Sequence, residues 1–150
     1  MKKIVITGAT SMIGTALTEI AARAGIEVYS IIRPDTKRAD RIINSDNVHV
    51  VYGALGNLKD VKGIPNDCDV FYHFAWAGTS KKDRNNPVVQ ERNIKYTLDA
   101  VCLAEKTGCR KFVGAGSQAE YGPTTDIINH NTKYDPTTSY GASKLAACIL

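Results

Sequence analysis

A short apolar strand, a loop bounded by glycines and a helix follow one another at the start of the chain. Residues 2–7 are apolar and rich in β-branched side chains, and residues 15–24 have helical spacing. Between them, a side chain at Gly8 would block the tight turn, and one at Gly14 would push the helix off the sheet. Any strand-to-helix turn can use glycine, but this loop stands where its amides and the helix N-terminus would bind a pyrophosphate.

The same alternation of strands and helices continues along the chain. We predict further strands at residues 26–32, 48–52, 69–75 and 111–115, and helices near 57–61, at 87–107 and from 139 onward. The strands are near-continuous apolar runs, which is typical of a parallel sheet covered on both faces. The sequence therefore predicts an α/β fold with a doubly wound parallel sheet, the three-layer α/β/α Rossmann fold, over residues 1–150. The irregular stretch 116–138 is of a length that is usually functional or disordered.

Composition narrows the class of protein. A chain of 150 residues, 43% hydrophobic and 23% charged, fits one domain with a sizeable core. Its net charge of +4 is spread along the chain, which argues against a nucleic-acid partner. No apolar run is long enough to span a membrane and no signal-peptide pattern precedes the first strand, so we expect a cytoplasmic protein without a membrane partner. The four cysteines lack motif spacing, and we expect reduced, mostly buried thiols.

The end of the second predicted strand bears on the choice of cofactor. The acidic residue that would bind ribose hydroxyls about 20 residues after the glycine loop is not evident, and Arg33 stands there instead. An arginine can pair with a 2′-phosphate, which favours NADP over NAD. Two alternatives stay open: Arg33 is a solvated loop charge, or Asp35 serves as the acid.

Three polar residues late in the chain predict a proton-transfer site. Tyr140 and Lys144 are four residues apart and therefore share one helix face, where a cation lowers the pKa of a phenol from its usual value near 10. Ser117 follows the fifth predicted strand. Because the carboxyl ends of parallel strands meet at one edge, we expect the glycine loop, residues 75–78 and Ser117 at the same edge. Each of these features also has a simpler interpretation: Tyr140 and Lys144 lie on a solvated helix face, and Ser117 is an ordinary loop hydroxyl.

Together these motifs resemble the extended short-chain dehydrogenase/reductase family, in its NAD(P)-dependent sugar-nucleotide epimerase/dehydratase branch. The resemblance covers essentially the whole chain and rests on the order T-G-A-x-x-x-x-G, H-F-A, a helix with Asn93, G-S-x-x-x-Y-G and Y-x-x-x-K. It implies that Tyr140 is the catalytic acid/base, that Lys144 lowers its pKa and holds the nicotinamide ribose, and that Ser117 hydrogen-bonds the reacting sugar oxygen. It also implies that Asn93 supports a proton relay.

The resemblance further implies a cofactor site and partners. The residues expected to bind NADP or NAD are Gly8, Ser11, Met12, Ile13, Gly14, Arg33, Leu55, Phe74, Ala75, Tyr140 and Lys144. No metal is expected, because no His or Cys residues are spaced to share one. The expected substrate is a nucleotide sugar. Family members often dimerise through two long helices, here residues 87–107 and the helix from Ser139, so a homodimer is compatible with the sequence.

Three departures from the family pattern narrow the expected reaction. Ser11 replaces the middle glycine of the loop, where a serine can also donate to a phosphate or ribose, and Ala54 stands where many members have an aspartate that contacts adenine. Gln118 and Ala119 follow Ser117 where dehydratases typically carry Asp-Glu, which argues against elimination of water. Epimerases and 4-keto reductases remain, both of which transfer a hydride at the sugar C4.

Two other functions are compatible with this fold. One is a non-catalytic NADP-binding regulator or scaffold, although such a protein has no need of a phenol tuned by an ammonium. The other is an inactive segment of a longer enzyme: the chain stops in an apolar run inside the predicted last helix, so we expect the substrate-binding part to be absent.

Three further residues have more than one interpretation. Glu120 is a substrate or positioning group or, by preference, a salt-bridged or solvated loop carboxylate. His73 is predicted to be a packed, hydrogen-bonded core residue rather than a ligand. Trp76 is either a pocket wall or part of the core.

Overall fold

The computed structural model describes all 150 residues, Met1–Leu150. The chain forms two compact units: unit 1 comprises Met1–Ala75 and Asp99–Ala115, and unit 2 comprises Trp76–Leu98 and Gly116–Leu150. The helices are α1 (Met12–Arg23), α2 (Pro87–Lys106) and α3 (Ser139–Ile149), with short 3₁₀ helices η1 (Ala39–Arg41), η2 (Leu55–Asp60) and η3 (Gln118–Glu120). None of these helices has the length and apolar character needed to cross a membrane.

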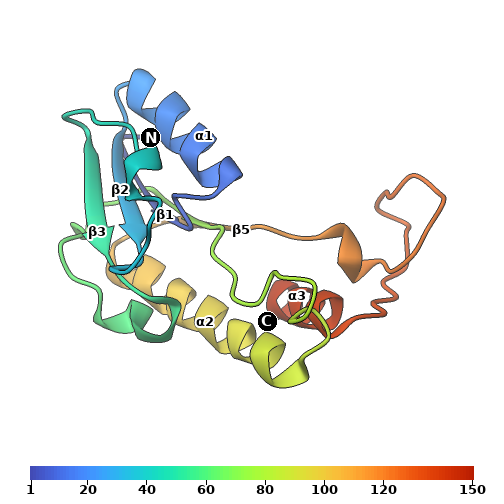
Figure 1. Cartoon of the computed structure of the whole chain (residues 1–150). Helices are drawn as coiled ribbons and strands as arrows, with labels where there is room; N and C mark the ends of the chain where they lie inside the picture. The colour runs from blue at the N-terminus through green and yellow to red at the C-terminus, as the bar shows by residue number, and fades with distance from the viewer. The chain divides into compact units, whose positions relative to one another are not determined.

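Unit 1 contains a parallel sheet of five strands, of which β1, β2, β3 and β5 are labelled in Figure 1. The strands are β1 (Lys3–Thr7), β2 (Glu27–Ile32), β3 (Val48–Tyr52), β4 (Val70–His73) and β5 (Lys111–Gly114), in the order β3-β2-β1-β4-β5. Every pair of neighbouring strands is parallel. The order reverses direction between β1 and β4, which is the point at which open α/β sheets bind their ligands. The predicted doubly wound sheet is confirmed.

Two apolar clusters cover the two faces of this sheet. Ile4 and Ile6 of β1 pack in one cluster with Ala21 of α1. Val5, between them in the strand, packs in the other cluster with Leu103 from the last turns of α2. Alternate residues of a strand point to opposite faces, so a run of apolar residues fills both cores at once. This arrangement confirms the predicted three layers.

The structure differs from the predicted elements in detail. The first helix begins at Met12 rather than at residue 15 because Ser11 caps it: Ser11 Oγ accepts a hydrogen bond from Gly14 N at 3.1 Å. The segment predicted as a helix near 57–61 is the 3₁₀ helix η2, with a kink at Asn57. The irregular stretch 116–138 contains only η3.

The cysteines correct one expectation. All four are free, as expected, but only Cys68 is buried. Cys109 is half-buried, and Cys102 and Cys148 are exposed. The expectation of mostly buried thiols is therefore wrong, because two of the cysteines lie on solvent-facing positions of α2 and α3.

Two glycines that follow helices have the same backbone conformation but different surroundings, so substituting each of them tests the close backbone approach at one of them. Gly108 and Gly25 both have left-handed backbones, with φ of 76° and 71°. A Cβ on Gly108 would lie 2.1 Å from the carbonyl oxygen of Asn66, whereas one on Gly25 meets nothing within 4 Å. We expect Gly25→Ala to lower the free energy of unfolding by about 1 kcal/mol, the cost of a left-handed residue, and Gly108→Ala to lower it clearly more. Chemical denaturation measures both, and equal losses would contradict the close approach at Gly108.

Candidate active site

The structure shows why both ends of the loop are glycines: a Cβ at either position would clash with nearby backbone. Gly8 has a left-handed backbone (φ 70°), and a Cβ there would lie 2.7 Å from the backbone nitrogen of Ala75, which follows β4. A Cβ on Gly14 would lie 2.3 Å from the carbonyl oxygen of Gly8. A side chain at Gly14 would thus strike the loop itself rather than the sheet. Because neither position has room for a side chain, no Cβ shields the backbone of the loop at either glycine, beside the N-terminus of α1, where an anion can bind. Two of the loop amides are bonded within the loop: Ser11 N donates to the Gly8 carbonyl at 2.9 Å, and Gly14 N donates to Ser11 Oγ at 3.1 Å.

A side-chain hydrogen bond ties the ends of β1 and β4 together. Thr7 Oγ1 and His73 Nδ1 lie 2.8 Å apart, and both residues are buried. The backbone nitrogen of Ala75 donates to the same threonine oxygen at 3.5 Å. His73 is therefore the packed, hydrogen-bonded residue that the sequence predicted. The bond links the first residue of the T-G-A motif to the first residue of the H-F-A motif.

The other residues of unit 1 predicted to bind a cofactor follow the carboxyl ends of its strands. Met12 and Ile13 are 82% and 54% exposed, which leaves both side chains available to a ligand. Leu55 begins η2 after β3, and Phe74 follows β4 directly. The hydroxyl of Ser11, expected to contact a phosphate or ribose, accepts the capping bond from Gly14 N.

Arg33 stands directly after β2 and is exposed. Its Nε lies 3.9 Å from Asp35 Oδ1, and both side chains are largely exposed. The two residues that the sequence offered as alternatives for contacting the adenine ribose therefore lie beside each other.

In unit 2, Ser117 and Glu120 form a capping box around η3. Ser117 Oγ accepts from Ala119 N at 3.2 Å, and Glu120 Oε1 accepts from Ser117 N at 2.6 Å. Glu120 is only 4% exposed, so the solvated alternative is wrong, and its carboxylate acts electrostatically on the buried Lys144. A Cβ on Gly141 would lie 2.2 Å from the carbonyl oxygen of Ala119, so this turn packs directly against the first turn of α3.

Tyr140 and Lys144 lie one turn apart on α3, and both contact Trp76. The ammonium nitrogen of Lys144 is 3.8 Å from the centroid of the Trp76 ring. The Tyr140 ring meets Trp76 edge-on, with the centroids 6.0 Å apart. The guanidinium of Arg84 lies 5.1 Å from the centroid of the Tyr140 ring. Trp76 therefore contacts both the predicted phenol and the predicted ammonium.

Lys144 is buried, with 7% of its surface exposed. Burial lowers its pKa from 10.5 to about 8, and the carboxylate of Glu120 opposes this shift. The side chain therefore still carries its charge at neutral pH but loses it under mildly alkaline conditions.

Polar side chains on the buried face of α2 hold the segment 76–78. Asn93 Oδ1 accepts from Ala77 N at 2.7 Å, and its Nδ2 donates to the Ala77 carbonyl at 3.1 Å. Gln90 Oε1 accepts from Trp76 Nε1 at 2.9 Å, and its Nε2 donates to the carbonyl of Gly78 at 2.7 Å. Asn93 and Gln90 are 1% and 0% exposed. The loop and its tryptophan are therefore fixed by two buried amides.

Gln90 and Arg84 are site residues that the sequence did not predict. Gln90, Asn93 and Thr97 are buried polar residues spaced three and four apart, so a polar stripe within an otherwise apolar helix face was the available signal for Gln90. Arg84 is an exposed residue in a polar loop, and nothing in the sequence distinguishes it from its neighbours. Its carbonyl accepts a hydrogen bond from Tyr140 N at 2.8 Å.

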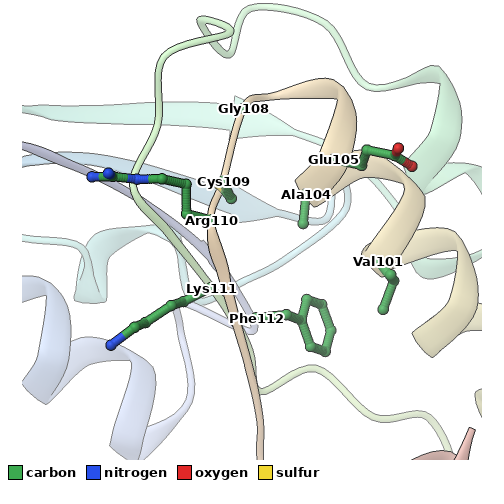
Figure 2. A pocket seen from close by; sticks show the side chains of 8 residues that line it. All are labelled: Val101, Ala104, Glu105, Gly108, Cys109, Arg110, Lys111 and Phe112. Atoms are coloured by element: carbon green, nitrogen blue, oxygen red, sulfur yellow. The ribbon is translucent and has the colours of Figure 1, made fainter.

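A pocket of about 370 Å³ in unit 1 lies away from the predicted residues. Figure 2 shows its lining, which comes from the end of α2 and the start of β5: Val101, Ala104, Glu105, Gly108, Cys109, Arg110, Lys111 and Phe112. In that view the side chains of Arg110 and Lys111 extend away from Val101 and Phe112. The pocket lies at the amino end of β5, whereas ligands of such sheets bind at the carboxyl ends. It contains none of the predicted site residues.

The comparison with known families settles the class of protein. The family model described as NAD dependent epimerase/dehydratase family matches residues 4–150. The chain belongs to this family. The match confirms the resemblance to the extended short-chain dehydrogenases/reductases and places the chain in a family of NAD-dependent enzymes.

Individual relatives agree with this assignment. GDP-mannose 4,6 dehydratase 1 of Arabidopsis thaliana is 25% identical, over 97% of this chain and 45% of its own length. A crystal structure of UDP-galactose 4-epimerase has 26% identity and a TM-score of 0.81, covering 98% of this chain and 49% of that one. The Bordetella bronchiseptica enzyme WbmG, solved with NAD, shares the fold at 22% identity and a TM-score of 0.78, covering 98% of this chain and 48% of that one. This chain of the epimerase/dehydratase family thus spans about half the length of these relatives.

The lowered pKa of Lys144 predicts a pH-dependent stability. In the unfolded state the pKa returns to the ordinary 10.5, whereas in the folded state it is about 8. Between these values the unfolded state binds more protons, so the free energy of unfolding rises as the pH rises through this window. We expect the difference in unfolding free energy between the wild type and Lys144→Met to grow in favour of the wild type from pH 8 to 10.5. Denaturation curves across this range measure it, and a pH-independent difference would contradict the buried, shifted lysine.

Proposed function

We propose that the protein transfers a hydride between a nicotinamide cofactor and C4 of a nucleotide sugar, as an epimerase or a 4-keto reductase. The observation that carries the proposal is the arrangement of unit 2: Tyr140 and the buried Lys144 on one face of α3, against which the Ser117 turn packs. A phenol beside a buried ammonium suits proton transfer at a sugar hydroxyl. When bound, the nicotinamide supplies or accepts the hydride.

Unit 1 has the features that a dinucleotide needs. Gly8 and Gly14 have no room for side chains, so a pyrophosphate can approach the backbone of the loop and the N-terminus of α1 closely. The exposed Met12 and Ile13 stand at the start of the same helix. We assign the cofactor contacts in this unit to Gly8, Ser11, Met12, Ile13, Gly14, Arg33, Leu55, Phe74 and Ala75.

The four site residues of unit 2 then have the following roles. Tyr140 gives or takes the proton at the sugar oxygen, and Lys144 holds the nicotinamide ribose while its charge acts on the phenol. Ser117 hydrogen-bonds the reacting sugar oxygen, although its hydroxyl also caps η3. Asn93 supports the proton relay by holding the backbone in place, because its side-chain amide bonds both the nitrogen and the carbonyl oxygen of Ala77.

The residues after Ser117 favour epimerisation or keto reduction over dehydration. Elimination of water needs an acid and a base next to the leaving hydroxyl, and Gln118 and Ala119 supply neither. The Arabidopsis relative is named a dehydratase and the structural relative an epimerase, so the family itself includes both chemistries. Glu120 does not replace the missing carboxylate, because it is buried and bonded to the Ser117 backbone.

A non-catalytic NADP-binding regulator is the second candidate. Nothing in such a function requires a lysine buried beside a tyrosine, which costs desolvation energy, so the burial of Lys144 favours the enzyme. Because the chain spans about half of its relatives, we propose that the residues that select the nucleotide sugar have no counterpart within residues 1–150. Turnover of a nucleotide sugar by the 150-residue chain alone would contradict this division.

Removing the hydroxyl of Tyr140 tests the reaction. In the longest natural form of the protein, we expect Tyr140→Phe to lower turnover by about 10² to 10⁴ because the acid/base is lost. Cofactor affinity should stay nearly the same, since the ring and its contact with Trp76 remain. Steady-state kinetics and cofactor titration measure the two effects. Tyr134→Phe, which removes the hydroxyl of a half-exposed tyrosine, is the matched control and should keep full activity; undiminished turnover in Tyr140→Phe would exclude the proposed role.

Arg33 tests the choice between NADP and NAD. We propose that its guanidinium pairs with the 2′-phosphate of NADP, so Arg33→Ala should weaken NADP binding by about fivefold, the effect of an exposed ion pair, and leave NAD binding nearly unchanged. Competition titrations with the two cofactors measure the ratio. The proposal is wrong if the wild type binds NAD more tightly and Arg33→Ala leaves NADP affinity unchanged.

A further inference from the structure

Trp76 is the only tryptophan of the chain, and its ring face carries the ammonium of Lys144. The distance of 3.8 Å between the lysine nitrogen and the ring centroid is well inside the range of a cation–π interaction. Lys144 is 7% exposed, so water solvates its charge poorly. A cation–π contact gains strength when the cation is desolvated, and the indole is the strongest aromatic partner among the side chains.

The tryptophan ring is itself held in place. Trp76 Nε1 donates to Gln90 Oε1 at 2.9 Å. The amide nitrogen of Gln90 donates to the carbonyls of Gly78 and Asp83, at 2.7 and 3.1 Å. Gln90 is fully buried, so its three hydrogen bonds fix the orientation of the indole without competition from water.

Other charged or titratable groups also surround this lysine. The Glu120 carboxylate from η3 stabilises the ammonium, and burial opposes it. Tyr140 lies on the same helix and forms a T-shaped pair with the Trp76 ring. The guanidinium of Arg84, from the loop before α2, lies over the Tyr140 ring. The indole face and the Glu120 carboxylate both favour the charged lysine.

We propose that Trp76 is a positioning residue for Lys144: its ring face holds the ammonium where the nicotinamide ribose is to be bound and stabilises its charged form, while Gln90 fixes the ring. The positioning role rests on the proposed function. The contact between indole and ammonium does not, because it can be measured with no cofactor or substrate present.

The single tryptophan makes the contact directly measurable. Intrinsic fluorescence of the natural protein, titrated from neutral to alkaline pH, should show a transition near the Lys144 pKa of about 8, as the ammonium beside the indole becomes a neutral amine. Lys144→Met should abolish this transition. Tyr140→Phe removes the phenol next to Trp76, and this variant should still show the fluorescence transition. Circular dichroism over the same range checks that the fold persists. Identical titration curves for the wild type and Lys144→Met would overturn the proposal.

Cofactor binding tests the positioning role. Trp76→Leu removes the aromatic face, and Trp76→Phe keeps one without the indole N–H. We expect Trp76→Leu to weaken NADPH binding by about threefold or more and to leave the binding of ADP, which lacks the nicotinamide ribose, unchanged; Trp76→Phe should recover most of the loss. Equal weakening of both ligands, or equal affinities in the Leu and Phe variants, would overturn the positioning role.

The two parts of the experiment separate the possible failures. If the wild type binds neither NADPH nor NADH while the fluorescence transition depends on Lys144, the proposed function fails and the contact stands. If the cofactors bind and Trp76→Leu has no selective effect, the proposed function stands and the positioning role of Trp76 fails.

Discussion

The close approach of two backbone segments at the end of β1 is the constraint on which unit 1 depends. The loop that begins at Gly8 runs so close to Ala75 that a single methyl group would strike its backbone nitrogen at 2.7 Å. The buried bond between Thr7 and His73 fixes the two strand ends that make this approach. The strand order reverses between β1 and β4, so the same backbone arrangement both packs the strand ends and places the glycine loop where open α/β sheets bind their ligands.

Unit 2 depends on a different device, a set of buried side-chain amides. Asn93 and Gln90 satisfy the backbone of segment 76–78 and the nitrogen of Trp76. Buried polar groups that are fully bonded fix one conformation, because any other would leave an amide unpaired. The ammonium of Lys144 lies over this fixed indole, so the hydrogen bonds made by α2 also determine where the ammonium on α3 is held. A lysine buried in this way is costly to stability, which is acceptable at a site that needs a positioned charge.

The fold was predictable from the sequence because its signals are local. Runs such as 48–52, together with the glycines that end the helices, determine the strands and turns, and the start of α1 was misplaced only because Ser11 was not recognised as its cap. Tyr140 and Lys144 were found by their spacing. The surroundings of Lys144 were not predictable, since Trp76, Gln90 and Glu120 come from separate parts of the chain and meet only in the folded unit.

The central claim is that this chain belongs to an enzyme that moves a hydride to or from a nucleotide sugar. The most direct measurement follows the absorbance of the bound nicotinamide after the natural, full-length protein, loaded with oxidised or reduced cofactor, is mixed with UDP-, dTDP-, CDP- and GDP-sugars. We predict that at least one sugar, or its 4-keto form, changes the redox state of the cofactor, and that Tyr140→Phe abolishes the change. A protein that binds the cofactor firmly but whose nicotinamide responds to none of these sugars would contradict the claim.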